Sequence, residues 1–203
     1  MTQSKKVPGS GMKIQIIIML VMVVGATVLG TVMLPKNEAE RAELMAMLGT
    51  TNMGTLISPT VNWVPLLPVG ENTSDDIDGH YRVVLIADGQ CDSGCQEMLA
   101  ATRAVEVRLG RDARRVDRIL LQHGLEPAVL ADIEAANPYL AIAALDSPAL
   151  AALLAPTTAQ LTGASRYYLI NPVGDAVLYY DEQNSGSDLL EDLKHLLKYS
   201  PSR

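Results

Sequence analysis

Hydrophobic residues are densest near the start of the chain. Residues 14–34 form a stretch without a charge, and Lys5, Lys6 and Lys13 precede it. A helix of this length spans about 30 Å, which matches the hydrocarbon core of a bilayer. A cleaved signal peptide has a shorter apolar region that ends in small residues, whereas this stretch ends in Val32-Met-Leu-Pro35. The pattern therefore predicts an uncleaved transmembrane helix over residues 14–34.

The basic residues on either side of this stretch predict its orientation. Residues 1–13 carry three Lys, whereas the first basic residues after the stretch, Lys36 and Arg41, lie among three Glu. The Lys and Arg bias places residues 1–13 in the cytoplasm and the remainder outside. We expect a single-pass protein of a bacterial inner membrane with a periplasmic C-terminal part. Small residues on the helix leave dimerisation open, because they would let two copies approach closely: Gly25, Ala26 and Gly30.

Residues 35–78 are predicted to contain a spacer helix and an extended lead-in. Asn37 and Glu40 have the spacing of a capping pair, which predicts a short helix over residues 39–48 that ends at Gly49. Residues 51–78 are rich in Pro, Gly, Asn and Ser and lack a helical period. They hold too many apolar residues for a free linker, so we expect them to pack across the domain that follows: Leu56, Ile57, Val61, Trp63 and Leu66.

Strand and helix patterns alternate from position 79 to the end, which predicts an α/β domain over residues 79–203. Apolar runs predict strands over residues 82–87, 116–122 and 139–145. Helical spacing or capping residues predict helices directly after the cysteines and over residues 127–136 and 147–154. Residues 167–171 and 176–180 flank a Pro-Val-Gly turn and predict an antiparallel hairpin. A stripe of leucines predicts the last helix.

Charge excludes one class of partner. Three of the 16 Lys and Arg residues precede position 34 and all 23 acidic residues follow it, so the outer part has a formal charge of −10. Nucleic acid is not an expected partner, because phosphate binding needs positive charge. Solubility is the plain explanation for an acidic surface, and attraction of a basic partner or a cation is the alternative.

The chain has two cysteines, Cys91 and Cys95, between a predicted strand and a predicted helix. Gly89 and Gly94 relax the backbone, so we expect Cys91 in the loop and Cys95 in the first helical turn. Amides at a helix N-terminus favour a thiolate, whereas Asp92 opposes it with a negative charge. The pattern favours a reactive or metal-binding pair.

A structural disulfide is the plain alternative in an oxidising compartment. A bridge that closes so short a loop constrains little of the unfolded chain, so stabilisation is a weak reason for it. We therefore expect thiol–disulfide exchange, with Cys91 as the more exposed, attacking sulfur.

A dithiol that opens a helix, a later Leu169-Ile-Asn-Pro-Val-Gly174 hairpin and a final amphipathic helix together resemble a thioredoxin-like fold. The three residues between the cysteines, the additional strand and helix over residues 139–154 and the N-terminal anchor make the chain similar to the Sco family. Members of that family are membrane-anchored assembly proteins of cytochrome c oxidase. The resemblance implies an assembly factor for a respiratory oxidase that exchanges disulfides with, or passes copper to, the thiols of a client subunit.

The same resemblance implies copper bound by Cys91, Cys95 and a histidine just before the hairpin. That position falls near Gly163, and residues 162–166 contain no histidine. The proline that precedes this hairpin in thioredoxins is replaced by Ser165, which departs from the pattern of an ordinary disulfide oxidoreductase. Because the histidine is missing, we favour thiol chemistry over stable copper storage, with Cys91 and Cys95 as the expected copper ligands.

The sequence allows two roles for several possible copper donors and charged residues near the cysteines. His123 follows the second strand of the domain and is the candidate third copper donor, with a surface histidine as the alternative. Arg166 would either lower the pKa of a cysteine or cover the edge of a strand. Met45 and Met47 are expected to pack in their helix rather than bind copper.

Two further functional readings compete with thiol exchange. Peroxidase chemistry requires a cation beside the reactive cysteine, whereas Arg103 lies two turns into the predicted helix. The second hypothesis from another class is a non-catalytic, membrane-tethered binding module that keeps the fold and a structural or vestigial disulfide.

Overall fold

The computed structural model describes residues 10–33, 52–68, 79–159 and 166–200, which divide between two compact units, 1–51 and 52–203. In the first unit, α1 (Ser10–Met33) contains an apolar span, Lys13–Thr31, that is long enough to cross a membrane. The span has no buried residues, which agrees with a helix that has no protein core around it. The expected spacer helix with Met45 and Met47 lies outside the described residues.

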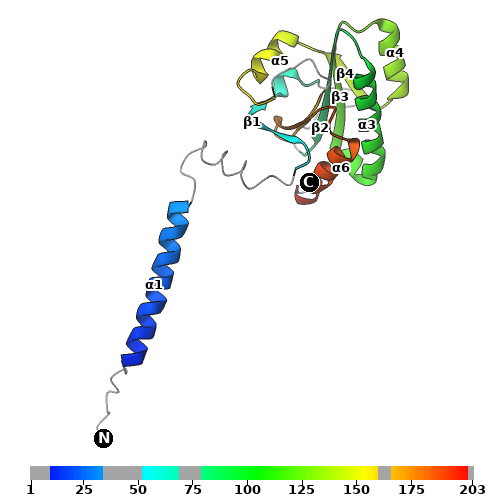
Figure 1. Cartoon of the computed structure of the whole chain (residues 1–203). Coiled ribbons are helices and arrows are strands. Elements are labelled where there is room, and N and C mark those ends of the chain that lie inside the picture. Colours follow the sequence, from blue (N-terminus) through cyan, green and yellow to red (C-terminus); the bar gives the residue numbers. More distant parts are fainter. Residues whose placement is uncertain (1–9, 34–51, 69–78, 160–165, 201–203) are drawn as a thin grey trace. The chain divides into compact units, whose positions relative to one another are not determined.

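The second unit is a six-stranded sheet with helices on both faces (Figure 1). The strand order is β1-β6-β5-β2-β3-β4. The strands are β1 (Thr55–Asn62), β2 (Tyr81–Asp88), β3 (Val116–His123), β4 (Leu140–Ala144), β5 (Tyr167–Ile170) and β6 (Asp175–Tyr180). The helices are α3 (Ser93–Leu109), α4 (Pro127–Ala136), α5 (Ser147–Leu154) and α6 (Gly186–Tyr199), with short 3-10 helices η1 (Val64–Leu66) and η2 (Gly110–Arg115).

The central strand β2 is buried on both faces, which explains its continuous apolar run. Val83 and Leu85 face the core formed with α3, α4 and α6, whereas Val84 faces the core formed with α5 and the lead-in residue Trp63. β2, β3 and β4 are parallel, and β5 and β6 form an antiparallel hairpin beside β2. The predicted order of alternating strands and helices and the α/β class are thus confirmed.

The sheet contains one strand that the sequence did not predict. β1 pairs antiparallel with β6 at the edge of the sheet, so part of the expected lead-in belongs to the sheet itself. Pro59 lies within β1 and has no backbone N–H, which a strand can tolerate at an edge but not at the centre. The lead-in therefore packs across the domain, as expected, and in addition contributes a strand.

A buried carboxylate ties this lead-in to the last helix. Asp192 of α6 is 3% exposed and accepts hydrogen bonds from the backbone N–H groups of Met53 and Gly54 and from the hydroxyl of Tyr180 at 2.8–3.1 Å. These three donors compensate for the loss of water around its oxygens. Asp192 thus holds the start of β1 against β6 and α6.

Candidate functional site

Cys91 and Cys95 lie where β2 leads into α3. Gly89 has a φ of 83°, in the left-handed region that favours glycine, and its N–H donates to the carbonyl of His123 at 2.7 Å. This contact turns the chain away from the sheet at the carboxyl end of β2. α3 begins at Ser93, so Cys91 lies in the loop and Cys95 in the first helical turn, as predicted.

The two cysteines form a disulfide, with their Cα atoms 5.1 Å apart. Cys95 is 5% exposed and packs in the core beneath α3, whereas Cys91 is half-buried at the surface. The expectation that Cys91 is the more exposed sulfur is therefore confirmed. Of the two cysteines, Cys91 is therefore the one that solvent can reach.

Asp92 has a structural function that its charge alone did not indicate. Its side chain caps α3, because Oδ1 accepts a hydrogen bond from the N–H of Cys95 at 3.0 Å. The same carboxylate places a negative charge next to the dithiol. The cap therefore fixes the first turn while opposing a thiolate in the reduced protein.

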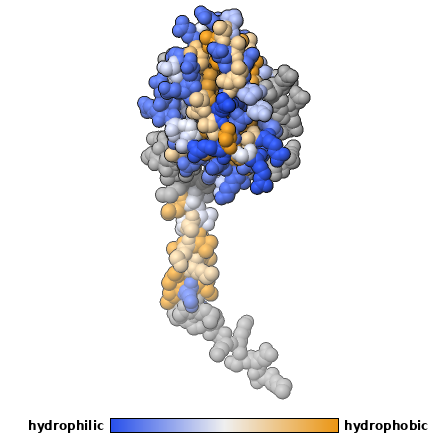
Figure 2. All heavy atoms as spheres, turned by 90° about the vertical axis from the view of Figure 1, so that its right-hand side faces the viewer, coloured by the Kyte–Doolittle hydropathy of each residue, from blue (hydrophilic) through white to orange (hydrophobic). Residues whose placement is uncertain are grey.

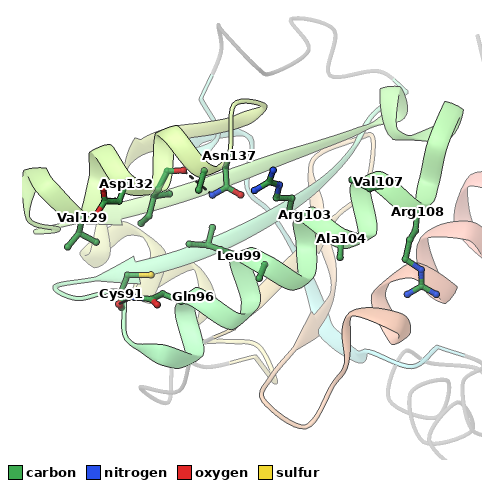
Figure 3. A pocket seen from close by; sticks show the side chains of 13 residues that line it. Cys91, Gln96, Leu99, Arg103, Ala104, Val107, Arg108, Val129, Asp132 and Asn137 are labelled. Atoms are coloured by element: carbon green, nitrogen blue, oxygen red, sulfur yellow. Dashed lines mark hydrogen bonds between the residues drawn. The ribbon is translucent and has the colours of Figure 1, made fainter.

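A groove of about 770 Å³ begins at Cys91 and runs between α3 and α4 (Figure 3). Apolar residues of both helices form much of its lining: Leu99, Ala100 and Ala104 from α3, and Val129, Ile133 and Ala136 from α4. Arg103 points from α3 into the space between the two helices (Figure 3). The dithiol thus opens into a surface groove.

Arg118 of β3 links the two walls of this groove from below. Its guanidinium donates to Glu106 Oε2 at 2.8 Å and to the carbonyl of Leu99 at 3.3 Å, both on α3. It also donates to Asn137 Oδ1, at the end of α4, at 3.1 Å. Burial lowers the pKa of Arg118, and the Glu106 carboxylate opposes that shift. Arg118 was not singled out in the sequence, because its partners lie 12 to 19 positions away.

The carboxyl ends of β2 and β3 carry a polar cluster beside the cysteine loop. His123 Nδ1 lies 3.0 Å from Asp88 Oδ1, and Ser147 Oγ donates to Asp88 Oδ2 at 3.1 Å. Both His123 and Asp88 are largely exposed. The hydroxyl contacts the carboxylate rather than the imidazole, so the three residues do not form a nucleophilic triad.

A third copper ligand would have to be one of the three histidines of the chain, and all three lie among the described residues. His80 lies 3.2 Å from Asp117 at the opposite end of β2, and the ring of His195 contacts Tyr199 on α6. No group of three metal-binding side chains occurs among the described residues. Soft thiolates suit Cu(I), so the reduced cysteines supply two suitable donors. The position near Gly163 and the Ser165 replacement lie outside the described residues.

Arg166 contacts an aromatic ring in the part of the chain that is described. Its guanidinium carbon lies 4.7 Å from the ring centre of Tyr179 on β6. Because β6 lies inside the sheet, this contact packs against a face of the sheet, and both expected roles of Arg166 stay predictions.

Comparisons with known proteins agree with this fold. The model of a family described as "Transmembrane-like, thioredoxin-like, C-terminal domain" matches residues 81–200. No curated protein gives a significant sequence match.

Two solved structures illustrate the fold. Apo Sco1 from Thermus thermophilus is 15% identical with a TM-score of 0.51, and the alignment covers 73% of this chain and 99% of that one. Yeast Sco1 with copper bound is 11% identical with a TM-score of 0.50, covering 75% of this chain and 97% of that one. The domain therefore has the thioredoxin-like fold of the Sco proteins, as the sequence resemblance implied.

Proposed function

Because the chain belongs to the transmembrane-like, thioredoxin-like C-terminal domain family, we propose that it is a membrane-anchored thiol–disulfide exchange protein whose reactive groups are Cys91 and Cys95. The position of the pair carries this proposal. Cys91 is accessible at the mouth of a groove, whereas Cys95 is buried at a helix N-terminus. One exposed sulfur for attack and one protected sulfur for resolution are what an exchange reaction requires.

In the reduced protein, the Cys91 thiolate attacks a client disulfide and releases one client thiolate. The Cys95 thiolate then attacks the Cys91 sulfur of the mixed disulfide, which releases the second client thiolate and closes the Cys91–Cys95 bond. Two electrons pass to the client, and the two protons of the dithiol balance the two client thiols. The reverse sequence oxidises a client dithiol.

The proposed client is a subunit of a respiratory oxidase, and the proposed location is a bacterial inner membrane with the domain in the periplasm. The Sco-like fold, the apolar α1 and the Lys-rich residues 1–13 support this assignment. Copper is then a cargo passed to the client thiols. Two thiolates without a histidine favour exchange over stable storage.

Mixing the reduced full-length protein in detergent with glutathione disulfide tests the exchange reaction. The wild type should form the Cys91–Cys95 bond and release glutathione. Cys95→Ser should stop with one glutathione on Cys91, and Cys91→Ser should react more slowly because Cys95 is buried. Equal rates for the two single variants would rule out the assigned roles.

Titration of the same reduced protein with Cu(I) tests the preference for thiol chemistry. We expect weak binding that competing chelators remove. Tight stoichiometric binding that survives replacement of His80, His123 and His195 would overturn that preference.

A non-catalytic binding module is the second candidate. Cys95, one half of the disulfide, is buried, and the apolar lining of the groove does not depend on whether the disulfide is reduced. Loss of oxidase assembly on Cys91→Ser substitution, with an unchanged unfolding transition, would exclude it.

A further inference from the structure

The groove between α3 and α4 extends well beyond the dithiol. Arg103, Val107 and Asn137 line both this groove and an adjoining cavity of about 310 Å³, which also reaches Tyr139. From Ser93 to Val107, α3 rises about 21 Å at 1.5 Å per residue. The continuous surface therefore has room for a peptide that extends away from Cys91.

Apolar side chains are exposed along this surface. Val107 is 75% exposed and Tyr139 is 70% exposed, although both belong to the well-packed domain. Figure 2 looks onto the side of the domain that carries α3 and α4 and shows a hydrophobic band between hydrophilic flanks. An exposed apolar band rimmed by polar residues is typical of a protein-binding surface.

Charge along the groove is opposite to that of the rest of the outer part. Arg103 and Arg108 line the groove with one acidic residue, Asp132, whereas residues 35–203 carry a formal charge of −10. Glu106 is paired with Arg118, so its carboxylate does not neutralise the groove. Among the residues that the structure describes, no carboxylate forms an ion pair with Arg103. An acidic ligand is therefore attracted to the groove and repelled by the surrounding surface.

We propose that this groove binds the segment next to the reactive cysteine of a client protein, and that it selects an apolar segment with an acidic residue opposite Arg103. This inference rests on the exchange function proposed above, because it requires the client cysteine to meet Cys91. Arg103 lies about 15 Å along α3 from its start, and an extended chain advances about 3.3 Å per residue. The acidic residue is therefore about five positions from the client cysteine.

Exchange rates with three disulfides test the proposal on the reduced full-length protein in detergent. The first is glutathione disulfide, which is too small to fill the groove. The second is a short apolar peptide whose cysteine is joined to glutathione and whose Glu lies about five positions away. The third carries Lys in place of that Glu. Versions with the charged residue before or after the cysteine establish the direction of the bound chain.

The wild type should react with the Glu peptide roughly fivefold faster than with the Lys peptide in one chain direction. Arg103→Glu should reverse that order, and it should change the rate with glutathione disulfide, which is too small to span from Cys91 to Arg103, by less than it changes the ratio of the two peptide rates. Arg114→Glu is the matched control, since it makes the same charge change at an exposed arginine outside the groove. It should preserve the wild-type order. Val107→Asn should slow both peptides but not glutathione disulfide.

Binding of a cysteine-free Glu peptide to the oxidised protein, measured by fluorescence anisotropy, tests docking without any redox step. We expect Arg103→Glu to weaken this binding roughly fivefold and Arg114→Glu to leave it unchanged. Failure of the wild type to react with glutathione disulfide would contradict the exchange function, while the anisotropy result would still decide on the groove.

Equal rates for the two peptides, or no effect of Arg103→Glu on peptide binding, would overturn the docking proposal. A change in oligomeric state upon Arg103→Glu, with peptide rates unaltered, would also overturn it, because the groove would then be an interface between copies of this chain.

Discussion

Asp92 has two opposing effects on the dithiol. Its side chain caps α3 by accepting the N–H of Cys95, which stabilises the fold, and its charge disfavours the thiolates of the reduced protein. The sequence alone indicates only the effect of the charge. The capping bond requires the extended backbone of Asp92 directly before the start of α3.

Replacing Asp92 by Asn or by Ala separates these effects. Both changes should lower the pKa of the cysteine thiols, since both remove the negative charge. Asp92→Asn should keep the free energy of unfolding, because Asn caps about as well as Asp, whereas Asp92→Ala should lower it by about 1 kcal/mol. Thiolate absorbance against pH and urea unfolding measure the two quantities, and a thiol pKa unchanged in both variants would contradict the argument.

Three buried tyrosines in the hairpin make the stability of the domain sensitive to high pH. Burial raises the pKa of Tyr167, Tyr168 and Tyr180, and for Tyr180 the Asp192 carboxylate adds to the shift. Tyr180 donates to Asp192, whereas the hydroxyl of Tyr167 has no hydrogen-bond partner in the described part of the chain. The two rings stack 4.9 Å apart.

These shifts predict alkaline destabilisation with a definite sign. An unfolded tyrosine ionises near pH 10, and the folded ones stay neutral to higher pH. Their contribution is therefore complete below pH 10 and is lost as pH rises towards the folded pKa values. Urea midpoints measured on both sides of about pH 10 check this, and a midpoint that does not fall above it would contradict the assignment.

Replacing Tyr180 or Tyr167 by Phe compares the stability contributed by a hydrogen-bonded hydroxyl with that of a hydroxyl without a partner. Tyr180→Phe should cost about 1–2 kcal/mol, because it removes a buried hydrogen bond to a carboxylate. Tyr167→Phe should be close to neutral, since it removes a hydroxyl without a partner. Urea unfolding at neutral pH makes the comparison, and equal losses for the two variants would be inconsistent with the described contacts.

At the scale of elements, the sequence predicted β2 to β6 and α3 to α6 because each has a clear apolar period, a cap or a turn. It did not predict β1, since Pro59 and the surrounding polar residues disfavour a strand that is not at an edge. The sequence predicted the reactive pair from the position of Cys91 and Cys95 between a strand and a helix. The groove was not found, because its spacing depends on long-range bonds of Arg118.

Arg118→Leu tests the link between α3, α4 and β3. The change leaves Asn137 and Glu106 without their charged partner, so we expect a loss of about 3 kcal/mol in the free energy of unfolding. The wild type and this variant should be compared by urea unfolding. Arg114→Leu removes an exposed arginine and should change the value by less than about 0.5 kcal/mol. Similar losses for both would show that Arg118 is not a structural link.

At the scale of the whole molecule, the chain divides into two units, residues 1–51 with α1 and residues 52–203 with the sheet. The apolar α1 was predicted from composition alone, because a span without charges needs no tertiary context. The sequence predicted that the domain starts at position 79. It did not include residues 52–68 in the domain, since their contribution depends on pairing with β6, more than a hundred positions later.

Two soluble fragments test where the domain begins. Residues 52–203 should unfold cooperatively, because they retain β1 and the fully buried Trp63. Residues 79–203 should be less stable by at least about 4 kcal/mol or fail to fold. This fragment lacks Ile57 and Trp63, whose removal exposes part of the core to water. Circular dichroism during urea unfolding distinguishes the fragments, and equal stability would place the domain boundary at 79.

The reduction potential of the Cys91–Cys95 pair in the full-length protein tests the central claim most directly. A pair with one accessible sulfur at the mouth of a groove, which exchanges electrons with client thiols, should have a potential above about −300 mV. Equilibration with dithiothreitol or glutathione redox buffers measures it. A potential below that value, with no reactive thiolate in the reduced protein, would indicate a structural bridge and contradict the proposed function.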